Sequence, residues 1–169
     1  MQLKKKPPKR RRLLSVMSSV YDPLGFISPF LLSAKIILQD PCRRKLKWDD
    51  VIARDCLHQA QRWLESLPAM DQFSVQLCYK PNEFGMIADV EIHHFSDASE
   101  VGYGGVFYLR LIDADSRVHC SFVMSKTRLA LLKPPSVPCL ELTAANLAVK
   151  PDKMLRKELE VPINRSVFF

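Results

Sequence analysis

Hydrophobic and polar residues change their spacing along this chain, from a helical period in the first part to a strand period in the second. Residues 28–38 carry one broad apolar face, and Ser28 is expected to cap a helix whose first residue is Pro29. Residues 49–67 repeat apolar side chains at three- and four-residue intervals until Pro68, which predicts a second helix. The first part of the chain is therefore expected to be helical.

From about Phe73 onward, apolar and polar residues alternate, which is typical of β-strands. Residues 113–116, "DADS", read as the turn of a hairpin. The alternating segments predict strands over 73–79, 90–97, 102–112 and 118–126, and "INRSVFF", 163–169, predicts a last one.

A helix is predicted over 139–149, between the third hairpin strand and the last strand, and Pro151 is expected to kink or stop it. From residue 91 the order is then strand, strand, strand, helix, strand. Hairpin links followed by a helical crossover predict a mixed sheet in an α/β fold.

The chain has 169 residues, and its hydrophobic content of 47% is enough to bury a core. Its net charge is +7, and residues 1–12 alone account for that excess, because residues 13–169 hold as many acidic as basic side chains. Such an arm is expected to be disordered. Its function has three alternatives: it binds nucleic-acid phosphates, it acts as a nuclear localisation signal, or it is only a solvated tail. Its basic residues are Lys4, Lys5, Lys6, Lys9, Arg10, Arg11 and Arg12.

The five cysteines are scattered without a C-x-x-C motif, which argues against both a disulfide framework and a zinc site. No signal peptide or membrane-spanning segment is apparent. We therefore expect an intracellular protein without a membrane partner, and the choice between nucleus and cytoplasm stays open.

Two acidic residues stand where a metal site would need them. Asp97 ends the strand over 90–97, and Glu141 lies in the first part of the following helix, beside the apolar positions Leu140 and Ala144. A carboxylate on the core-facing side of a helix is costly unless it is paired or binds a metal. A divalent cation would relieve the repulsion of two close carboxylates, and Mg²⁺ prefers such oxygen ligands.

The alternative for both acids is structural. Asp97 would cap the turn at Ala98-Ser99, and Glu141 would be a first-turn acid favoured by the helix dipole. His93 and His94 are expected to be surface or packing residues rather than ligands.

Several long segments occur together in a recognisable order: "LLSVMSSVYDPLGFISPFLLSAKIILQD", "HHFSDASEVGYGGVFYLRL", "CSFVMSKTRLALLKPPSVPCLELTAANLAVK" and "MLRKELE". Together they closely resemble the Pao (BEL/Pao) family of LTR retrotransposon polyproteins, over Arg12 to Phe169. This region often carries the label Pao retrotransposon peptidase. An aspartic peptidase would show Asp-Thr-Gly or Asp-Ser-Gly, and "SDAS" at 96–99 is neither.

The resemblance implies the end of a reverse transcriptase followed by a ribonuclease H-like domain that acts on RNA–DNA hybrids with Mg²⁺. It implies that Asp97 is the first metal-binding carboxylate and Glu141 the second. The family's third carboxylate belongs to a "W-T-D-S" motif that would follow "INRSVFF", where this sequence ends. The resemblance therefore implies a C-terminally truncated domain with an incomplete metal site and little or no activity alone. The expected partner of this domain is the rest of the polyprotein.

The expected organisation has four parts. They are a basic disordered arm over 1–12, a helical reverse-transcriptase tail over 13–72, a linker with a strand over 73–90, and the ribonuclease H-like domain over 91–169. Three alternatives stay open: an active Mg²⁺-dependent nuclease completed by missing residues or another chain, a domesticated nucleic-acid-binding module, and, with least support, a peptidase.

Overall fold

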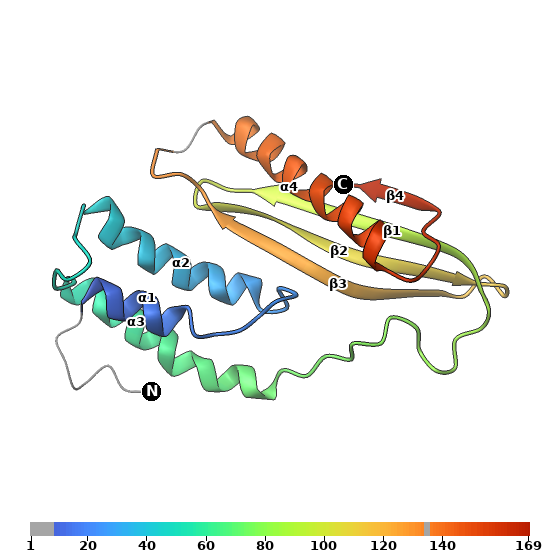
Figure 1. Cartoon of the computed structure of the whole chain (residues 1–169), viewed down its shortest axis with the longest axis horizontal. Coiled ribbons are helices and arrows are strands. Elements are labelled where there is room, and N and C mark those ends of the chain that lie inside the picture. The colour runs from blue at the N-terminus through green and yellow to red at the C-terminus, as the bar shows by residue number, and fades with distance from the viewer. Residues whose placement is uncertain (1–8, 134–135) are drawn as a thin grey trace. The chain divides into compact units, whose positions relative to one another are not determined.

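The computed structural model describes residues 9–133 and 136–169, which belong to two compact units (Figure 1). The helical unit contains residues 27–75 and the described residues of 9–23. The sheet unit contains Leu24–Phe26 and the described part of 76–169. Leu24–Phe26 belong to the sheet unit because Ser125 donates its N–H to the Leu24 carbonyl at 2.8 Å and its hydroxyl to the Gly25 carbonyl at 2.6 Å.

The helical unit consists of α1 (Arg10–Met17), α2 (Ser28–Arg43), α3 (Arg54–Ser66) and the 3-10 helix η1 (Leu67–Gln72). The indole N–H of Trp63 donates to the Phe30 carbonyl at 3.1 Å, so the polar atom of this large core residue is satisfied. The apolar faces of the helices form one buried core of Leu13, Met17, Ala34, Ile37, Ile52, Cys56, Ala60 and Trp63.

Both predicted helices of this unit are present, but Ser28 is the first residue of α2 and not its cap, which is Ile27. The second helix begins later than the spacing indicated. It begins at Arg54 rather than near residue 49. Asp50 accepts a hydrogen bond from the Lys47 backbone N–H at 2.7 Å, and Val51 forms a β-bridge with Lys9. These contacts hold the segment before α3 in a turn, which a periodicity argument does not detect.

The predicted disordered arm is wrong for residues 9–12, and residues 1–8 lie outside the described part of the chain. Arg10, Arg11 and Arg12 form the first turn of α1. Leu13 and Met17 of the same helix are buried, so core packing orders a segment whose charge alone would favour disorder.

The sheet unit has four strands in the order β3-β2-β1-β4: β1 (Ile87–Ala98), β2 (Gly102–Asp113), β3 (Val118–Leu129) and β4 (Arg165–Phe168). The first three are antiparallel neighbours joined by short turns, and β4 returns parallel to β1 after the helix α4 (Val137–Glu158). The mixed sheet of an α/β fold is therefore confirmed.

The predicted hairpin turn at 113–116 is present between β2 and β3. Asp113 is buried there, and its Oδ1 accepts the backbone N–H of Asp115 at 3.0 Å and of Arg117 at 2.8 Å. Burial raises the pKa of Asp113, but the hydrogen bonds from Arg117 outweigh it and the pKa is lowered. Ser116 takes the positive φ of 63° that closes the turn.

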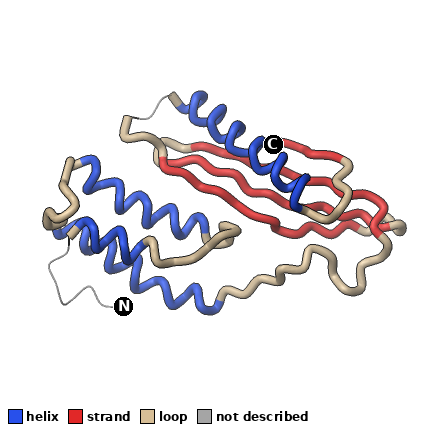
Figure 2. The backbone as a smooth tube through the Cα atoms, in the orientation of Figure 1, coloured by secondary structure: helices blue, strands red, loops and turns tan. Residues whose placement is uncertain are grey.

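One predicted strand is wrong. Residues 73–79 form no strand and lead into the loop before β1 (Figure 2). Phe73 is 53% exposed and Leu77 is 68% exposed, so their apolar side chains are not buried against a sheet. Alternation in the sequence is insufficient here, because a strand needs a neighbour that pairs its backbone groups.

Helix α4 lies across one face of the sheet, against β1 and β2 (Figure 1). It runs unbroken through Pro151, so the prediction that this proline stops the helix is wrong. Pro151 is itself buried, and tertiary packing offsets the lost helical hydrogen bond. The buried core of this unit comprises Val90, Ile92, Phe107, Leu109, Leu111, Val123, Met124, Ala148 and Leu155.

Strand alternation divides the side chains of β1 between two faces. Val90, Ile92 and His94 are buried on the face that α4 covers. Their neighbours Glu91 and His93 belong to the opposite face. Pairing with β2 is regular from Asp89 to Ala98, so the side chains of β1 keep alternating between the same two faces up to the end of the strand.

Candidate functional site

Asp97 is an exposed residue at the C-terminal end of β1, one position before the strand ends. Its Oδ1 accepts the backbone N–H of Ala98 at 2.8 Å, and Ser99 closes the turn by donating its N–H to the Gly102 carbonyl at 2.8 Å. Asp97 therefore makes the local turn contact expected of a structural aspartate. That contact occupies Oδ1 and involves no charged partner.

The residue paired with Asp97 on the neighbouring strand is Gly104. A Cβ at Gly104 would lie 2.9 Å from the Lys126 carbonyl oxygen, which is closer than real side chains approach a backbone atom. The position beside Asp97 is thus restricted to glycine. No side chain of β2 therefore lies directly opposite Asp97.

Glu141 lies in the second turn of α4 and is exposed. The prediction that it shares the core-facing side of the helix is wrong. Leu140 and Ala144 are buried, and Glu141 follows Leu140 by one position, which turns it about 100° around the helix axis. A carboxylate next to two apolar positions in sequence can still face solvent.

Asp97 and Glu141 belong to the same end of the sheet. Residues of α4 near Glu141 line a pocket that reaches the start of β2 and the end of β3, and β2 begins opposite the end of β1 (Figure 1). Strand alternation places Asp97 on the face away from α4, so a cation shared with Glu141 would lie beyond the strand end rather than over the sheet. The pocket is lined by Tyr103, Arg128, Thr143, Asn146, Leu147 and Lys150.

The ligand chemistry fits Mg²⁺, and the number of ligands is small. Both side chains are carboxylates, the oxygen donors that Mg²⁺ prefers, and both are open to the several waters that this ion retains. Among the described residues, no group of three or more acidic, histidine or cysteine side chains is placed to hold a metal ion. The assignment of Asp97 and Glu141 as ligands stays a prediction.

The predicted basic residues have different environments. Lys4, Lys5 and Lys6 lie outside the described residues. Lys9 and Arg11 approach Asp49 at 3.7 and 3.4 Å in exposed ion pairs. Arg10 and Arg12 are half-buried, and the Arg10 guanidinium lies 4.3 Å from the centre of the Trp48 ring. Lys9, Arg10, Arg11 and Arg12 are therefore part of a folded surface.

A buried charge cluster that periodicity did not reveal crosses three strands on the face away from α4. Glu91 is 4% exposed. Its carboxylate accepts hydrogen bonds from Arg110 of β2 at 2.9 Å and from Arg165 of β4. It also pairs with the His93 ring at 2.8 Å. His93 and the two arginines lower the pKa of Glu91 to about 2, despite burial, which raises it. In the sequence, the only sign of this cluster was an acidic residue, Glu91, within an apolar strand. Its arginine partners belong to distant segments of the chain.

A second cluster lies on the face that α4 covers. His94 is fully buried between Phe107, with its ring edge-on at 5.2 Å, and Phe168, whose ring stacks at 4.3 Å. Its Nε2 pairs with Asp152 of α4 at 3.0 Å, and the Ser166 hydroxyl of β4 donates to the same carboxylate. His94 is a packing residue, as expected, and it joins β1, α4 and β4.

Stability is expected to fall as the pH drops below about 6.5, the ordinary pKa of histidine. Burial lowers the pKa of His94, and Asp152 offsets this only in part. Below this pH the His94 imidazole binds a proton in the unfolded chain but stays neutral in the native state. The free energy of unfolding therefore falls by up to about 1.4 kcal/mol per pH unit. Denaturant titrations between neutral and mildly acidic pH measure this slope.

The variant His94→Gln is expected to flatten that slope, whatever its effect on stability at neutral pH. The exposed residue His58 offers the control, and His58→Gln should leave the slope unchanged. A slope that persists in His94→Gln would assign the pH dependence to another group.

Comparison with known proteins gives one family. A family model described as Pao retrotransposon-like RNaseH-like domain matches residues 9–169, which include both the helical unit and the sheet unit. No curated protein matches the chain. Within the described residues, no helix combines the length and the apolar character needed to cross a membrane.

Proposed function

Because the chain belongs to the Pao retrotransposon-like RNaseH-like domain family, we propose that it acts within a retrotransposon polyprotein on the RNA strand of RNA–DNA hybrids. Asp97 and Glu141 are the proposed Mg²⁺ ligands. The family description names a ribonuclease H-like domain rather than a peptidase, in agreement with the absence of an Asp-Thr-Gly motif.

The observation that carries this proposal is the position of Asp97 in the sheet. β1 and β4 are parallel neighbours linked through α4, so their C-terminal ends meet at one edge. Open α/β sheets bind ligands outside the carboxyl ends of their strands. Asp97 is the acidic residue at that end of β1, and it is exposed.

When bound, Mg²⁺ would stabilise the charge that develops on the phosphodiester oxygens and lower the pKa of an attacking water. The residues of this chain would supply its anionic ligands. Asp97 is anchored through Oδ1 to the Ala98 N–H, which orients the carboxylate, whereas the longer Glu141 side chain extends from α4. Because both are exposed, a phosphate backbone can approach them from solvent.

Residues 1–169 supply two such carboxylates, and we propose that this chain alone binds Mg²⁺ weakly and cleaves slowly. The register of β4 indicates where a third ligand would arrive. Phe168 pairs with His94, and the Phe169 carbonyl accepts the Ser96 backbone N–H at 3.3 Å. Residues that continue β4 in a longer polypeptide would therefore run beside Asp97, where the family's Trp-Thr-Asp-Ser motif is expected.

A cleavage assay on two polypeptides tests this proposal. Residues 1–169 would be compared with a longer polypeptide that continues β4 through Trp-Thr-Asp-Ser, on a labelled RNA–DNA hybrid, duplex DNA and single-stranded RNA. The longer polypeptide is expected to cut only the RNA of the hybrid, in a Mg²⁺-dependent reaction at least about 100-fold faster than residues 1–169. Binding of the hybrid without Mg²⁺-dependent cleavage by the longer polypeptide would refute the nuclease proposal and favour a binding module.

Two further assignments belong to the same proposal. We propose that the helical unit is the tail of the reverse transcriptase that precedes this domain in the polyprotein. We also propose an intracellular, reducing location, supported by the exposed free thiols of Cys78, Cys120 and Cys139.

A further inference from the structure

The start of α1 and the loop between α2 and α3 form one connected surface in the helical unit. The Arg11 N–H donates to the Trp48 carbonyl at 3.0 Å, and the β-bridge between Lys9 and Val51 continues the pairing. We call this surface the basic end, and its exposed cationic residues are Lys9, Arg11, Arg43, Lys45 and Lys47.

Arg10 holds the two segments of the basic end together. Its guanidinium donates to the Leu46 carbonyl at 2.6 Å and to the Cys42 Sγ at 2.9 Å, and it covers the ring of Trp48. These contacts direct the Arg10 charge inward. Arg10 is therefore a positioning residue, and the exposed lysines and arginines around it are the groups available to a ligand.

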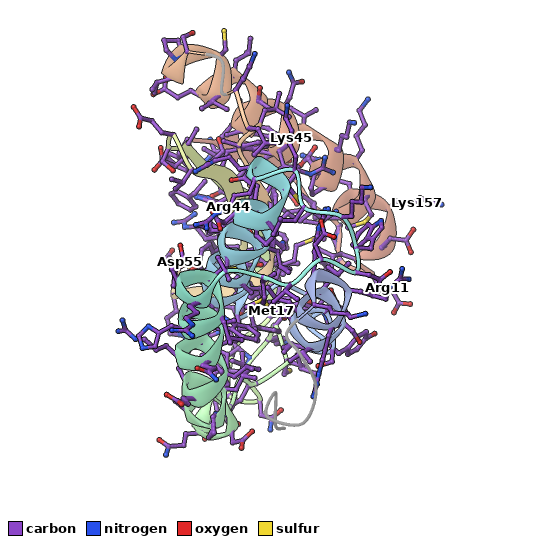
Figure 3. The ribbon with its side chains drawn as sticks, turned by 90° about the vertical axis from the view of Figure 1, so that its left-hand side faces the viewer. Arg11, Met17, Arg44, Lys45, Asp55 and Lys157 are labelled. Carbon is purple, nitrogen blue, oxygen red and sulfur yellow. The ribbon has the colours of Figure 1, made fainter. Side chains whose placement is uncertain are left out.

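Few acidic side chains neutralise the basic end. Residues 9–12 and 43–50 together contain eight lysines and arginines and only two acids, Asp49 and Asp50. Arg44 pairs with Asp40 at 2.8 Å. It also pairs with Asp55 at 2.5 Å, and Figure 3 labels Arg44 and Asp55.

The described residues provide no ion pair for Arg43, Lys45 or Lys47, all of which are exposed. The basic end thus has an uncompensated positive charge.

Helix dipoles do not account for this arrangement. A cation at the C-terminus of α2, such as Arg43, is favourable, but Lys9 and Arg11 lie at the N-terminus of α1, where a cation is unfavourable. Lys45 has a φ of 57°, a left-handed conformation at a helix end that normally selects glycine. Lys9 and Arg11 share the single carboxylate of Asp49, and Arg43, Lys45 and Lys47 have no ion pair among the described residues. An external anion would compensate the positive charge that remains.

We propose that the basic end binds the phosphate backbone of a nucleic acid, separately from the carboxylates of the sheet unit. Lys9, Arg11, Arg43, Lys45 and Lys47 would contact successive phosphates without reading base sequence. The choice of nucleic acid over other polyanions rests on the proposed function, because a ribonuclease H-like domain acts on one.

Binding of a fluorescent RNA–DNA hybrid to the 169-residue chain tests the proposal, in EDTA so that no metal bridges protein and phosphate. The triple variant Arg43→Gln/Lys45→Gly/Lys47→Gln is expected to bind about 30-fold more weakly, with a salt slope smaller by about 2–3. Arg62→Gln, an exposed charge near the other end of α3, should change affinity by less than about twofold. The proposal would be overturned if the single variants Arg62→Gln and Lys47→Gln lost affinity for the hybrid equally.

The single variant Lys45→Gly separates binding from folding. Glycine relieves the left-handed backbone at this position, so the melting midpoint is expected to stay unchanged or rise while the affinity for the hybrid falls. An unaltered affinity would overturn the proposal. Loss of binding to anionic phosphatidylserine vesicles, with no change toward the hybrid, would assign the basic end to a lipid surface instead.

Cleavage by the longer polypeptide distinguishes this proposal from the nuclease proposal. If the basic-end variants lose binding although no polypeptide cleaves the hybrid, the binding proposal stands and the nuclease proposal fails. If cleavage by the longer polypeptide requires Asp97 but the basic-end variants bind normally, the binding proposal alone is overturned.

Discussion

Asp97→Asn is expected to lower Mg²⁺-dependent cleavage of an RNA–DNA hybrid by at least about 100-fold, in the polypeptide that continues β4 beyond Phe169. The substitution keeps the size of the side chain and removes the negative charge that a cation would bind. Such a loss corresponds to about 2.7 kcal/mol of transition-state stabilisation. Single-turnover rates of RNA cleavage at saturating Mg²⁺ measure it.

Asp89 provides a matched control on the same strand. Asp89 accepts the backbone N–H of Val90 at 3.0 Å, just as Asp97 accepts that of Ala98 at 2.8 Å. Asp89 lies near the other end of β1, so Asp89→Asn should leave cleavage within about threefold of the unaltered polypeptide. Equal rates for the two variants would assign Asp97 a purely structural role.

Binding of Mn²⁺ to residues 1–169 tests the shared cation without relying on activity. Paramagnetic broadening of backbone amide signals is expected around both Asp97 and Glu141, and it should disappear from both regions in Asp97→Asn. Broadening confined to one of the two regions would show that these carboxylates do not share an ion.

Glu91→Ala is expected to lower the free energy of unfolding of the sheet unit by about 2–4 kcal/mol. The substitution leaves Arg110 and Arg165 without the buried carboxylate that joins β2, β1 and β4. Chemical denaturation followed by circular dichroism measures the loss. Glu100, an exposed acid beyond β1, is the control, and Glu100→Ala should change stability by less than about 0.5 kcal/mol.

The pH dependence gives a second readout of Glu91. The folded-state pKa of about 2 lies below the ordinary value of 4.5, so its stabilising contribution is complete above that value and is lost as the pH falls toward 2. The difference in stability between the unaltered protein and Glu91→Gln should shrink over this acidic range. A constant difference between neutral pH and pH 2 would contradict the assigned pairing.

The sequence predicted local features of the sheet unit with accuracy. Alternation located β1, β2 and β3, and the "DADS" segment located the turn between two of them, where Asp113 and Ser116 supply the turn chemistry. These features depend on neighbours in sequence, which a periodicity argument includes. Alternation also placed Asp97 at the end of its strand, and β1 ends one residue later, at Ala98.

The candidate site was predicted only in part. The sequence indicated Asp97 and Glu141, but Glu141 is exposed rather than core-facing, and strand alternation places Asp97 on the face of the sheet away from α4. The partners of Glu91 and His94 were not predicted, because Arg165 and Asp152 are 74 and 58 residues away along the chain. Contacts at such separation follow from the crossover through α4.

By itself, the sequence determined most of the helical and extended segments, where the main turn lies, and which carboxylates are candidates for a metal. Tertiary structure decided what each segment does. Packing ordered residues 9–12, carried α4 through Pro151, and left residues 73–79 without a strand to pair with. The physical reason is that hydrophobic burial and strand pairing depend on distant partners, and these terms outweigh the local preferences that a sequence displays.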